Sequence, residues 1–193
     1  MKIRTIALLS GALATTLALA GCSMEGMDMG GGTSPSSSTS SESSSANNAD
    51  ITFAMQMVAH HEQAIEMAQM VLDKDGVDPR VTELAQNIKD AQGPEIDTMN
   101  GWLDSWGASG SMDGMDMGGT MSDADMAALK AASGSEANKL FLEQMTVHHE
   151  GAIDMAKTEL QTGQNADALA LAQKIVDDQT AEIARMKDLL DTL

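Results

Sequence analysis

The sequence predicts an all-α protein, more specifically a four-helix bundle built from two duplicated helical hairpins. The first observation behind this prediction is a long stretch of helical character that occurs twice. The second is the composition: 42% of the residues are hydrophobic but only 2% are aromatic, so Ala, Leu, Ile and Met must fill the core, as suits packed helices. The third is a set of helix start and stop signals at the matching positions of each copy.

The repeat covers nearly all of the predicted bundle. Residues 53–72 and 141–160 are identical at eleven of twenty positions with an offset of 88, and together they contain all four histidines. Residues 84–103 recur at 171–190 with an offset of 87. The lost residue lies in the turn before Gly163, and a deletion confined to a loop is what a duplicated helical hairpin tolerates.

Capping signals define the first hairpin. Asp50 is suited to cap a helix that runs to about Lys74. Asp78-Pro79 opens the second helix, with proline at the first helical position, and this helix is expected to run to about Trp106. Gly93-Pro94 predicts a kink or a short break within it.

The second hairpin follows a longer crossover. We expect a short helix over 122–132, ended near Gly134, and a third long helix over 136–161 with Gly163 as its stop. Asn165 is expected to cap a fourth helix that runs almost to Leu193. Two hairpins joined by such a crossover make a four-helix bundle over 50–193, with a Met/Gly loop at 107–121.

The first 21 residues have the pattern of an export signal, with Lys2 and Arg4 before an apolar run. The sequence Leu19-Ala20-Gly21-Cys22 resembles the bacterial lipobox, which implies that Cys22 becomes the lipidated first residue of the mature chain. The alternative is an ordinary signal peptide with a chance cysteine. Cys22 is the only cysteine, so no internal disulfide or thiolate metal site is expected.

Residues 22–49 are rich in Met, Gly and Ser and predict a flexible tether, because they cannot bury enough apolar surface to offset their ordering entropy. We expect an exported protein, on the outer face of the cytoplasmic membrane or in the periplasm, that meets the membrane through its lipid only. The formal net charge of −18 argues against nucleic acid as a partner and is compatible with cation capture.

The repeated histidine helix carries the candidate chemistry. Successive residues of a helix are 100° apart around its axis. On the first histidine helix, the residues of one broad arc are therefore expected to face the core, while Glu62 and Glu66 face water. Adjacent histidines straddle this arc, so a pair on one helix is not expected to hold one ion alone. A methionine four residues before a histidine can share an ion with it. The arc contains Phe53, Met57, His60, His61, Ala64, Met67, Ala68 and Val71, and the methionine–histidine pairs are Met57 with His61 and Met145 with His149.

Buried imidazoles need partners, because each one left without a hydrogen bond costs about 1–3 kcal/mol. Glu95 and Glu182 occupy equivalent positions in the apolar arcs of the second and fourth helices, where they can support a histidine or bind metal themselves. A metal-free His–Glu network that fixes the packing is the alternative. The candidate ligands inside the bundle are His60, His61, His148, His149, Met57, Met145, Met67, Met155, Met99 and Met186, although the methionines also suit core packing.

Two further methionine clusters lie outside the predicted helices. They have the pattern Met-x-x-Met-x-Met within Gly- and Asp-rich segments, which core packing does not explain, although low-complexity drift could. Thioether beside imidazole favours copper, and Cu(I) above all. These residues are Met24, Met27 and Met29 in the first segment and Met112, Met115 and Met117 in the second.

The signature Met-x-x-His-His-Glu-x-Ala-Ile-x-Met-Ala, present at 57–68 and 145–156, resembles that of the bacterial family catalogued as domain of unknown function 305. The resemblance covers about residues 50–193. It implies a ferritin-like four-helix bundle, usually exported, and an association with copper binding and copper tolerance.

The leading hypothesis is an extracytoplasmic lipoprotein that binds Cu(I) or Ag(I) for sequestration, tolerance or handover, with a copper chaperone or transporter as a potential partner. An enzyme is the less favoured class: a di-iron or di-manganese oxidase usually draws a Glu-x-x-His motif from each of two helices, and no glutamate stands three residues before any histidine here. A metal-free structural domain is the third hypothesis.

Overall fold

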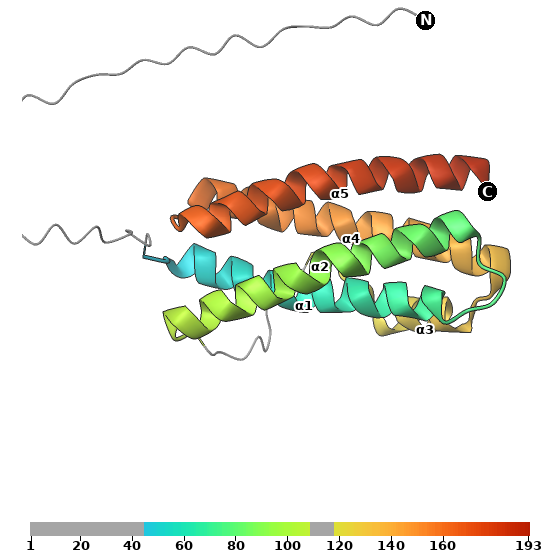
Figure 1. The fold of residues 1–193 in the computed structure, drawn as a ribbon, viewed down its shortest axis with the longest axis horizontal. Helices are drawn as coiled ribbons and strands as arrows, with labels where there is room; N and C mark the ends of the chain where they lie inside the picture. The colour runs from blue at the N-terminus through green and yellow to red at the C-terminus, as the bar shows by residue number, and fades with distance from the viewer. Residues whose placement is uncertain (1–44, 109–117) are drawn as a thin grey trace, which may run out of the picture. The chain divides into compact units, whose positions relative to one another are not determined.

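The computed structural model describes residues 45–108 and 118–193. The chain divides into two units, residues 1–39 and 40–193, and all of the described residues belong to the second. This part of the chain forms five helices (Figure 1): α1 (Asn48–Leu72), α2 (Pro79–Trp106), α3 (Asp123–Ala131), α4 (Gly134–Thr162) and α5 (Ala166–Thr192). The all-α class predicted from the sequence is confirmed. The segments predicted as signal peptide, lipidation site and most of the tether lie outside the described residues.

Helix α1 starts three residues earlier than predicted. Its N-cap is Asn47, whose side chain accepts hydrogen bonds from the backbone N–H groups of Ala49 and Asp50. The Asp50 carboxylate in turn accepts a hydrogen bond from the Asn47 N–H, which completes a capping box. Asp50 is therefore the third residue of the helix, and the prediction that it is the cap was wrong.

Helix α2 begins as predicted, with Asp78 as its cap and Pro79 at the first position. It does not break at Gly93-Pro94, because Pro94 lies inside a continuous helix. Pro94 is exposed, so its ring and the backbone carbonyl that it leaves without an amide partner can face water. Gly107, with a φ of 66°, ends the helix in the left-handed conformation that favours glycine.

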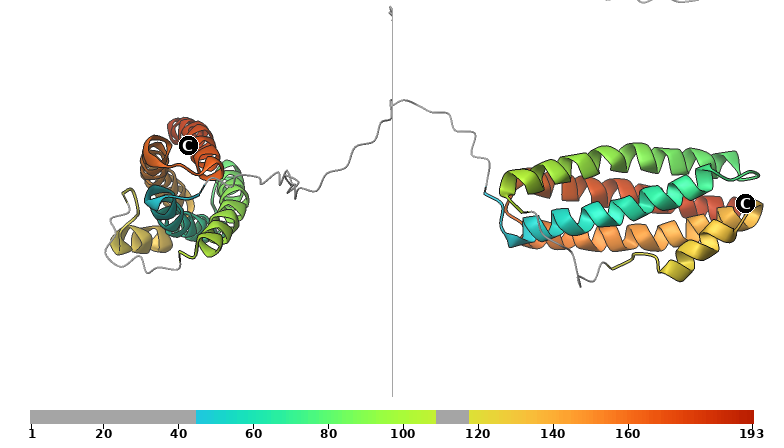
Figure 2. Two further views of the ribbon diagram at one scale, coloured as in Figure 1. Left: turned by 90° about the vertical axis from the view of Figure 1, so that its left-hand side faces the viewer. Right: turned by 90° about the horizontal axis from the view of Figure 1, so that it is seen from below.

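The second half of the chain follows the predicted order of elements. Ser122 caps α3 through a capping box, Gly163 ends α4, and Asn165 caps α5 with its side chain. Gly134 is the first residue of α4 rather than the end of the helix before it. Helix α3 packs beside α4 and α1, outside the four long helices, as the end-on view in Figure 2 shows.

The long helices pack as two antiparallel hairpins, α1 with α2 and α4 with α5, which meet mainly through α1 and α4 (Figures 1 and 2). Helices α1 and α4 run antiparallel, because the Asn47 side chain, before α1, donates to the backbone carbonyl of Thr162, at the end of α4. The core has two hydrophobic clusters, one toward each end. None of the described helices is long and apolar enough to cross a membrane.

Candidate metal centre

The centre of the bundle holds two histidines whose rings are in close contact. His60 lies at the middle of α1 and His148 at the middle of α4, and their ring centroids are 3.7 Å apart with a 41° angle between the rings. The exposed fractions are 0% for His60 and 1% for His148. None of their four ring nitrogens has a hydrogen-bond partner among the described residues. These nitrogens are therefore polar groups that the described protein atoms leave unsatisfied.

The second histidine of each helix is held by a glutamate from the other helix of its hairpin. His61 Nε2 lies 2.8 Å from the Glu95 carboxylate on α2, and His149 Nε2 lies 2.7 Å from the Glu182 carboxylate on α5. A carboxylate accepts, so Nε2 carries the proton in each bond, and Nδ1 of both rings is left without a partner among the described residues. The expected contacts of Glu95 and Glu182 with the histidines are present.

The two histidine–glutamate pairs differ in one respect. Glu95 also accepts a hydrogen bond from Lys174 on α5, with Nζ 2.9 Å from Oε1. The side chain of Glu95 is 11% exposed, compared with 23% for Glu182. The pair on α1 and α2 is therefore the more buried and the more extensively bonded of the two.

Burial keeps three of these histidines neutral. Loss of solvation lowers the pKa of His60 to about 3, and the nearby His61 adds to the effect. The backbone of Gly118 lies close enough to oppose this shift in part. Burial also lowers the pKa values of His61 and His148, despite the bond of His61 to Glu95. Neutral imidazole is the form that binds metal ions.

The opposite effect applies to Glu95. Burial by itself would raise the pKa of its carboxyl group, but the hydrogen bonds from His61 and Lys174 outweigh burial and hold that pKa below its usual value. Glu95 is therefore a carboxylate at neutral pH, beside an uncharged imidazole.

The methionines of the core form two repeat-related sets, on either side of the histidine pair along α1 and α4. Five of the six side chains are fully buried, and Met155 is half-buried. One set belongs to the cluster toward the α1–α2 turn, and the other to the opposite cluster. The first set is Met67, Met145 and Met186, and the second is Met57, Met99 and Met155.

Within the described residues, no three His, Cys, Asp or Glu side chains converge in a way that could hold a metal ion. A site in this core must therefore use fewer of these ligands or add thioether sulfur. Low coordination by imidazole and thioether suits soft monovalent ions such as Cu(I) and Ag(I) better than hard divalent ones. Met24, Met27, Met29, Met112, Met115, Met117 and Cys22 lie outside the described residues.

The end of the Met/Gly loop is attached directly over this centre. A Cβ atom on Gly151 of α4 would lie 2.2 Å from the backbone oxygen of Gly118, so the loop backbone requires glycine at this position. The equivalent residue on α1 is Gln63, whose side chain donates to the backbone carbonyl of Met121 and accepts from its N–H. We did not predict either contact from the sequence, although position 63/151 is one at which the two repeats differ.

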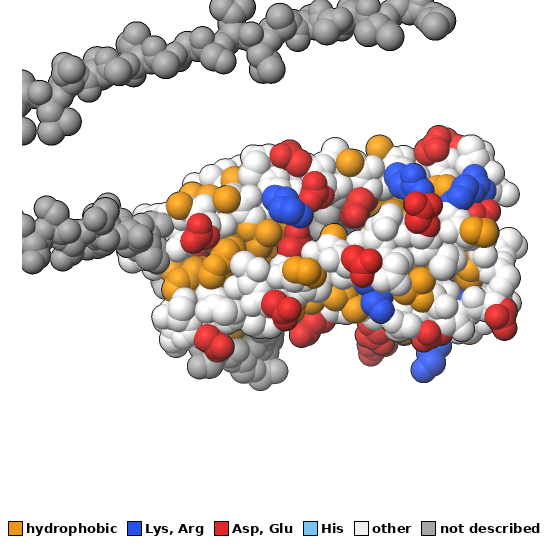
Figure 3. Space-filling view, in the orientation of Figure 1, with side chains coloured by type: hydrophobic (Ala, Val, Ile, Leu, Met, Phe, Trp, Pro, Cys, Tyr) orange, Lys and Arg blue, Asp and Glu red, His pale blue; other side chains and the backbone are white. Residues whose placement is uncertain are grey.

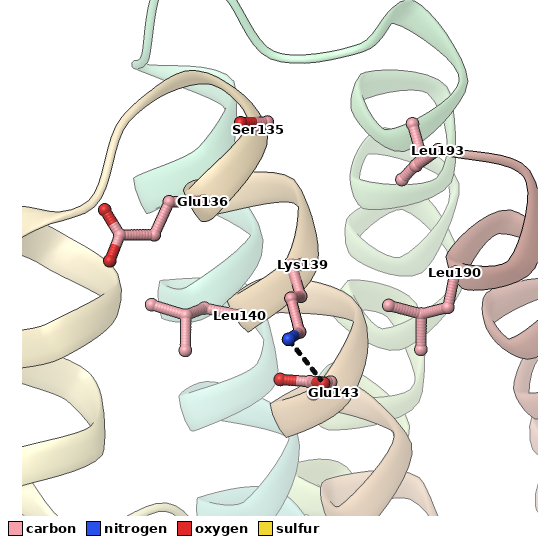
Figure 4. A pocket seen from close by; sticks show the side chains of 7 residues that line it. All are labelled: Ser135, Glu136, Lys139, Leu140, Glu143, Leu190 and Leu193. Carbon is pink, nitrogen blue, oxygen red and sulfur yellow. Dashed lines mark ion pairs between the residues drawn. The ribbon is translucent and has the colours of Figure 1, made fainter.

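The surface hollows differ in the residues that line them. One hollow of about 630 Å³ at the start of α4 is lined by Leu140, Leu190, Leu193 and the Lys139–Glu143 ion pair, and offers no histidine or methionine (Figure 4). Another, of about 220 Å³, lies between α2 and α5 and is lined by Glu95 and Glu182 themselves. Acidic side chains are scattered over the face that carries α5 and α2 (Figure 3).

These features define a class: an α-helical protein that buries paired histidines between methionine-rich clusters. The family profile described as domain of unknown function DUF305 matches residues 50–190. The chain belongs to this family, as its repeated histidine signature predicted. No curated protein matches the sequence.

Similar solved structures support the assignment to this family. A DUF305 protein from Streptomyces coelicolor is 38% identical, with 75% of this chain and 93% of that chain covered and a TM-score of 0.70. A DUF305 fragment from Deinococcus radiodurans is 29% identical, with 77% and 99% covered and a TM-score of 0.70. CopM in its Cu(I)-bound form is 30% identical, with 74% and 96% covered and a TM-score of 0.63. CopM has also been solved with Cu(II) and with silver.

Proposed function

We propose that this protein binds Cu(I), or Ag(I) in its place, inside the bundle through the paired histidines of α1 and α4. The observation that carries the proposal is the set of four buried imidazoles, which leave six ring nitrogens without a partner among the described residues. Each unsatisfied buried group costs about 1–3 kcal/mol. A bound soft cation would satisfy several of them at once.

The surrounding residues support this choice of metal. Imidazole suits copper, and thioether sulfur favours its monovalent state. Met57, four residues before His61, and Met145, four before His149, are the methionines that the helix spacing puts within reach. Met67, Met155, Met99 and Met186 are further candidate ligands, with core packing as their alternative role. Glu95 and Glu182 orient the second histidine of each pair.

The comparison with CopM supports the same proposal. CopM has been solved with Cu(I), Cu(II) and silver bound, and its sequence is about 30% identical to this chain. A similarity at this level suggests metal binding but does not identify ligands. The assignment to His60, His61, His148 and His149 rests on burial and on unpaired nitrogens in this chain.

We further propose that the protein acts outside the cytoplasm as a lipoprotein. Residues 1–21 would be the signal peptide, Cys22 the lipid-bearing residue, and residues 22–49 the tether that carries the bundle of residues 50–193. The relative from Streptomyces coelicolor is provisionally named a secreted protein. The Met-x-x-Met-x-Met segments at 24–29 and 112–117 would capture ions, and the bundle would hold them for sequestration or for handover to a chaperone or transporter.

The equivalence of the two hairpins supports their origin by duplication, within a bundle of ferritin-like arrangement. An oxidase with two metal ions is the alternative that such an arrangement brings to mind. It would need several carboxylates directed at the histidines, whereas Glu95 and Glu182 are those that contact them in the described core. Oxygen consumption on addition of Fe(II) to the purified protein would favour the oxidase.

A competition titration tests the binding proposal. The purified protein, kept anaerobic and reduced, is titrated against Cu(I) held by a coloured chelator of moderate affinity. We expect the protein to withdraw Cu(I), and a variant with alanine at 60, 61, 148 and 149 to lose at least tenfold in affinity. A variant with leucine at Met112, Met115 and Met117 is the matched control, and should retain the affinity of the bundle site.

Equal affinity of the four-alanine variant and the wild type would refute the histidine assignment. Circular dichroism and thermal melting of each variant establish that it is folded. Added Ag(I) should raise the melting temperature of the wild type, because a ligand of the native state stabilises it. No shift in either protein would favour the metal-free structural domain.

A further inference from the structure

We propose that the hollow between α2 and α5 is the port through which a monovalent soft cation reaches the buried histidines, and that Lys174 regulates its entrance. The proposal rests on the proposed function and concerns the rate of ion transfer rather than the identity of the ligands. The hollow measures about 220 Å³ and lies over the centres of both outer helices.

The walls of the hollow include two repeat-related pairs of polar residues. Gln92 and Glu95 from α2 face Gln179 and Glu182 from α5, and each pair is separated by 87 residues in the sequence. Glu95 and Glu182 are also the two carboxylates that hold His61 and His149. The floor of the hollow is therefore in direct contact with the histidine cluster.

The glutamines provide an independent reason to expect a ligand in the hollow. Gln92 is 3% exposed and Gln179 is 4% exposed. Both polar atoms of the Gln92 side chain and Oε1 of Gln179 have no hydrogen-bond partner among the described residues. Buried amides are normally satisfied, and here both repeats keep an unsatisfied one at the same position. Amide oxygens at these positions can replace water molecules around a cation as it enters.

A path of imidazoles continues inward from this floor. The Glu182 carboxylate lies 2.7 Å from His149, the rings of His149 and His148 are 6.3 Å apart, and those of His148 and His60 are 3.7 Å apart. An ion can thus pass from carboxylate to imidazole in short steps. Because no three His, Cys, Asp or Glu side chains in the described residues converge on one point, the port offers no chelating trap that would retain the ion.

Lys174 contacts two carboxylates of the hollow and is present in one repeat only. Its ammonium group bonds Glu95 Oε1 at 2.9 Å and Asp178 Oδ2 at 2.7 Å, and both carboxylates line the hollow. The equivalent residue in the first repeat is Asn87. Lys174 therefore neutralises part of the negative potential that would attract a cation, and its removal should accelerate entry.

The test measures the rate and the equilibrium of Cu(I) transfer separately, by stopped-flow absorbance of the coloured chelator and by titration. In the variant Gln92→Leu/Gln179→Leu, apolar side chains replace the amides that line the port. We expect transfer to and from the protein to slow at least tenfold with the affinity unchanged. Ions enter and leave by the same path, so blocking it slows both rates by the same factor.

The matched control is Gln86→Leu/Gln173→Leu. These glutamines are on the same two helices, are also separated by 87 residues, and are exposed, with side-chain bonds to Asp90 and Asp177 instead of a place in the hollow. The control should transfer Cu(I) at the wild-type rate. The variant Lys174→Gln should take up Cu(I) two- to fivefold faster, and the gain should shrink in high salt because exposed charges are screened.

Equal rates in the port variant and the control would overturn the port while leaving the binding site intact. A slow variant whose affinity also falls would overturn it as well, since the glutamines would then act on the bound state. A wild type that withdraws no Cu(I) refutes the proposed function and the port together. If Val147→Trp, at the hollow beside Gly118 and Gly151, slows transfer and the port variant does not, ions enter on the loop side.

Discussion

The two repeats are alike at the centre of the bundle and different at its periphery. Each contributes a histidine pair, a glutamate that holds the second histidine, and three methionines. Away from the centre, equivalent positions carry different chemistry: Asp50 against Asn138, Gln63 against Gly151, Asn87 against Lys174. The difference indicates that the centre serves the shared function, whereas the periphery sets stability and access.

The two ends of the bundle show this contrast most clearly. At one end, the buried Asp50 carboxylate accepts hydrogen bonds from the backbone N–H groups of Gln164 and Asn165, at the start of α5. At the other end, the side chain of Asn138 accepts one from the N–H of Asp78, at the start of α2. The same position thus secures the opposite hairpin in both repeats, once with a charge and once without.

The charged end includes a second carboxyl group, Glu159, which is 1% exposed. Its carboxyl fits against Gly163, where a Cβ atom would lie 2.1 Å from Glu159 Oε1. Burial, with the adjacent Asp50, raises the pKa of Glu159 to about 8. Protonated, Glu159 can donate to Asp50, whose own pKa is lowered by its backbone hydrogen bonds although burial opposes them. The position equivalent to Glu159 is Val71, which cannot titrate.

The largest effect is expected for the pH dependence of stability caused by Asp50 and Glu159. The folded protein keeps the Glu159 proton while the unfolded chain releases it near the ordinary pKa of 4.5, so the stabilising effect of this proton is complete below that pH. As the pH rises toward 8 this stabilisation is lost, and the free energy of unfolding falls by roughly 2–4 kcal/mol. The wild type should therefore lose stability relative to Glu159→Gln as the pH rises. Free energies of unfolding of both proteins, measured in urea at pH 5, 7 and 9, test this. A constant difference would show that the pair does not titrate.

The second comparison concerns the attachment of the loop over the histidines. Gly151→Ala places a methyl group against the backbone of Gly118 and Gly119, which cannot yield as a flexible side chain would; overpacking of this kind costs about 1–3 kcal/mol. Gln63→Ala removes two hydrogen bonds to Met121, each contributing about 0.5–1.5 kcal/mol. Thermal melting should show a loss of comparable size in both variants. A wild-type melting temperature for Gly151→Ala would mean that the loop is not seated there.

The smallest expected effect is the difference in stability between variants of the two histidine–glutamate pairs. Glu95→Gln removes a charge bonded to both His61 and Lys174, whereas Glu182→Gln removes one that, among the described residues, is bonded to His149 alone. Hydrogen bonds to charged groups are worth about 1.5–3 kcal/mol and neutral ones about 0.5–1.5 kcal/mol, so each bond that the amide keeps should lose about 1 kcal/mol, and the more exposed Glu182 should lose less. Urea denaturation should therefore place Glu95→Gln below Glu182→Gln in stability. The reverse order would contradict the role given to Lys174.

Sequence patterns within one helix predicted the core well. All eight residues of the arc on α1, from Phe53 to Val71, are buried, and Glu62 and Glu66 are exposed. The contacts of Glu95 and Glu182 with histidines followed from the same periodicity, because an inward carboxylate in an apolar arc must find a donor. Helical spacing determines which residues share a face, so relations of this kind follow from the sequence alone.

Relations between helices were not predictable in the same way. The contact of Asp50 with Asn165, the cap of α5, spans 115 residues. It depends on how α1 and α4 align along their lengths, which local periodicity does not determine. Asp50 was assigned as a cap because its side chain suits that role, but Asn47 suits it too and lies at the true start of the helix. The port glutamines were visible as repeated residues, Gln92 and Gln179, but their burial between α2 and α5 was not.

The central claim is that the histidines shared by α1 and α4 bind a soft monovalent ion. X-ray absorption at the copper edge of the anaerobic Cu(I)-loaded protein tests this claim most directly. We predict scattering from imidazole rings around copper, and its loss in the variant with alanine at 60, 61, 148 and 149. A copper shell of sulfur alone, unchanged in that variant, would contradict the account and assign the metal to the methionines.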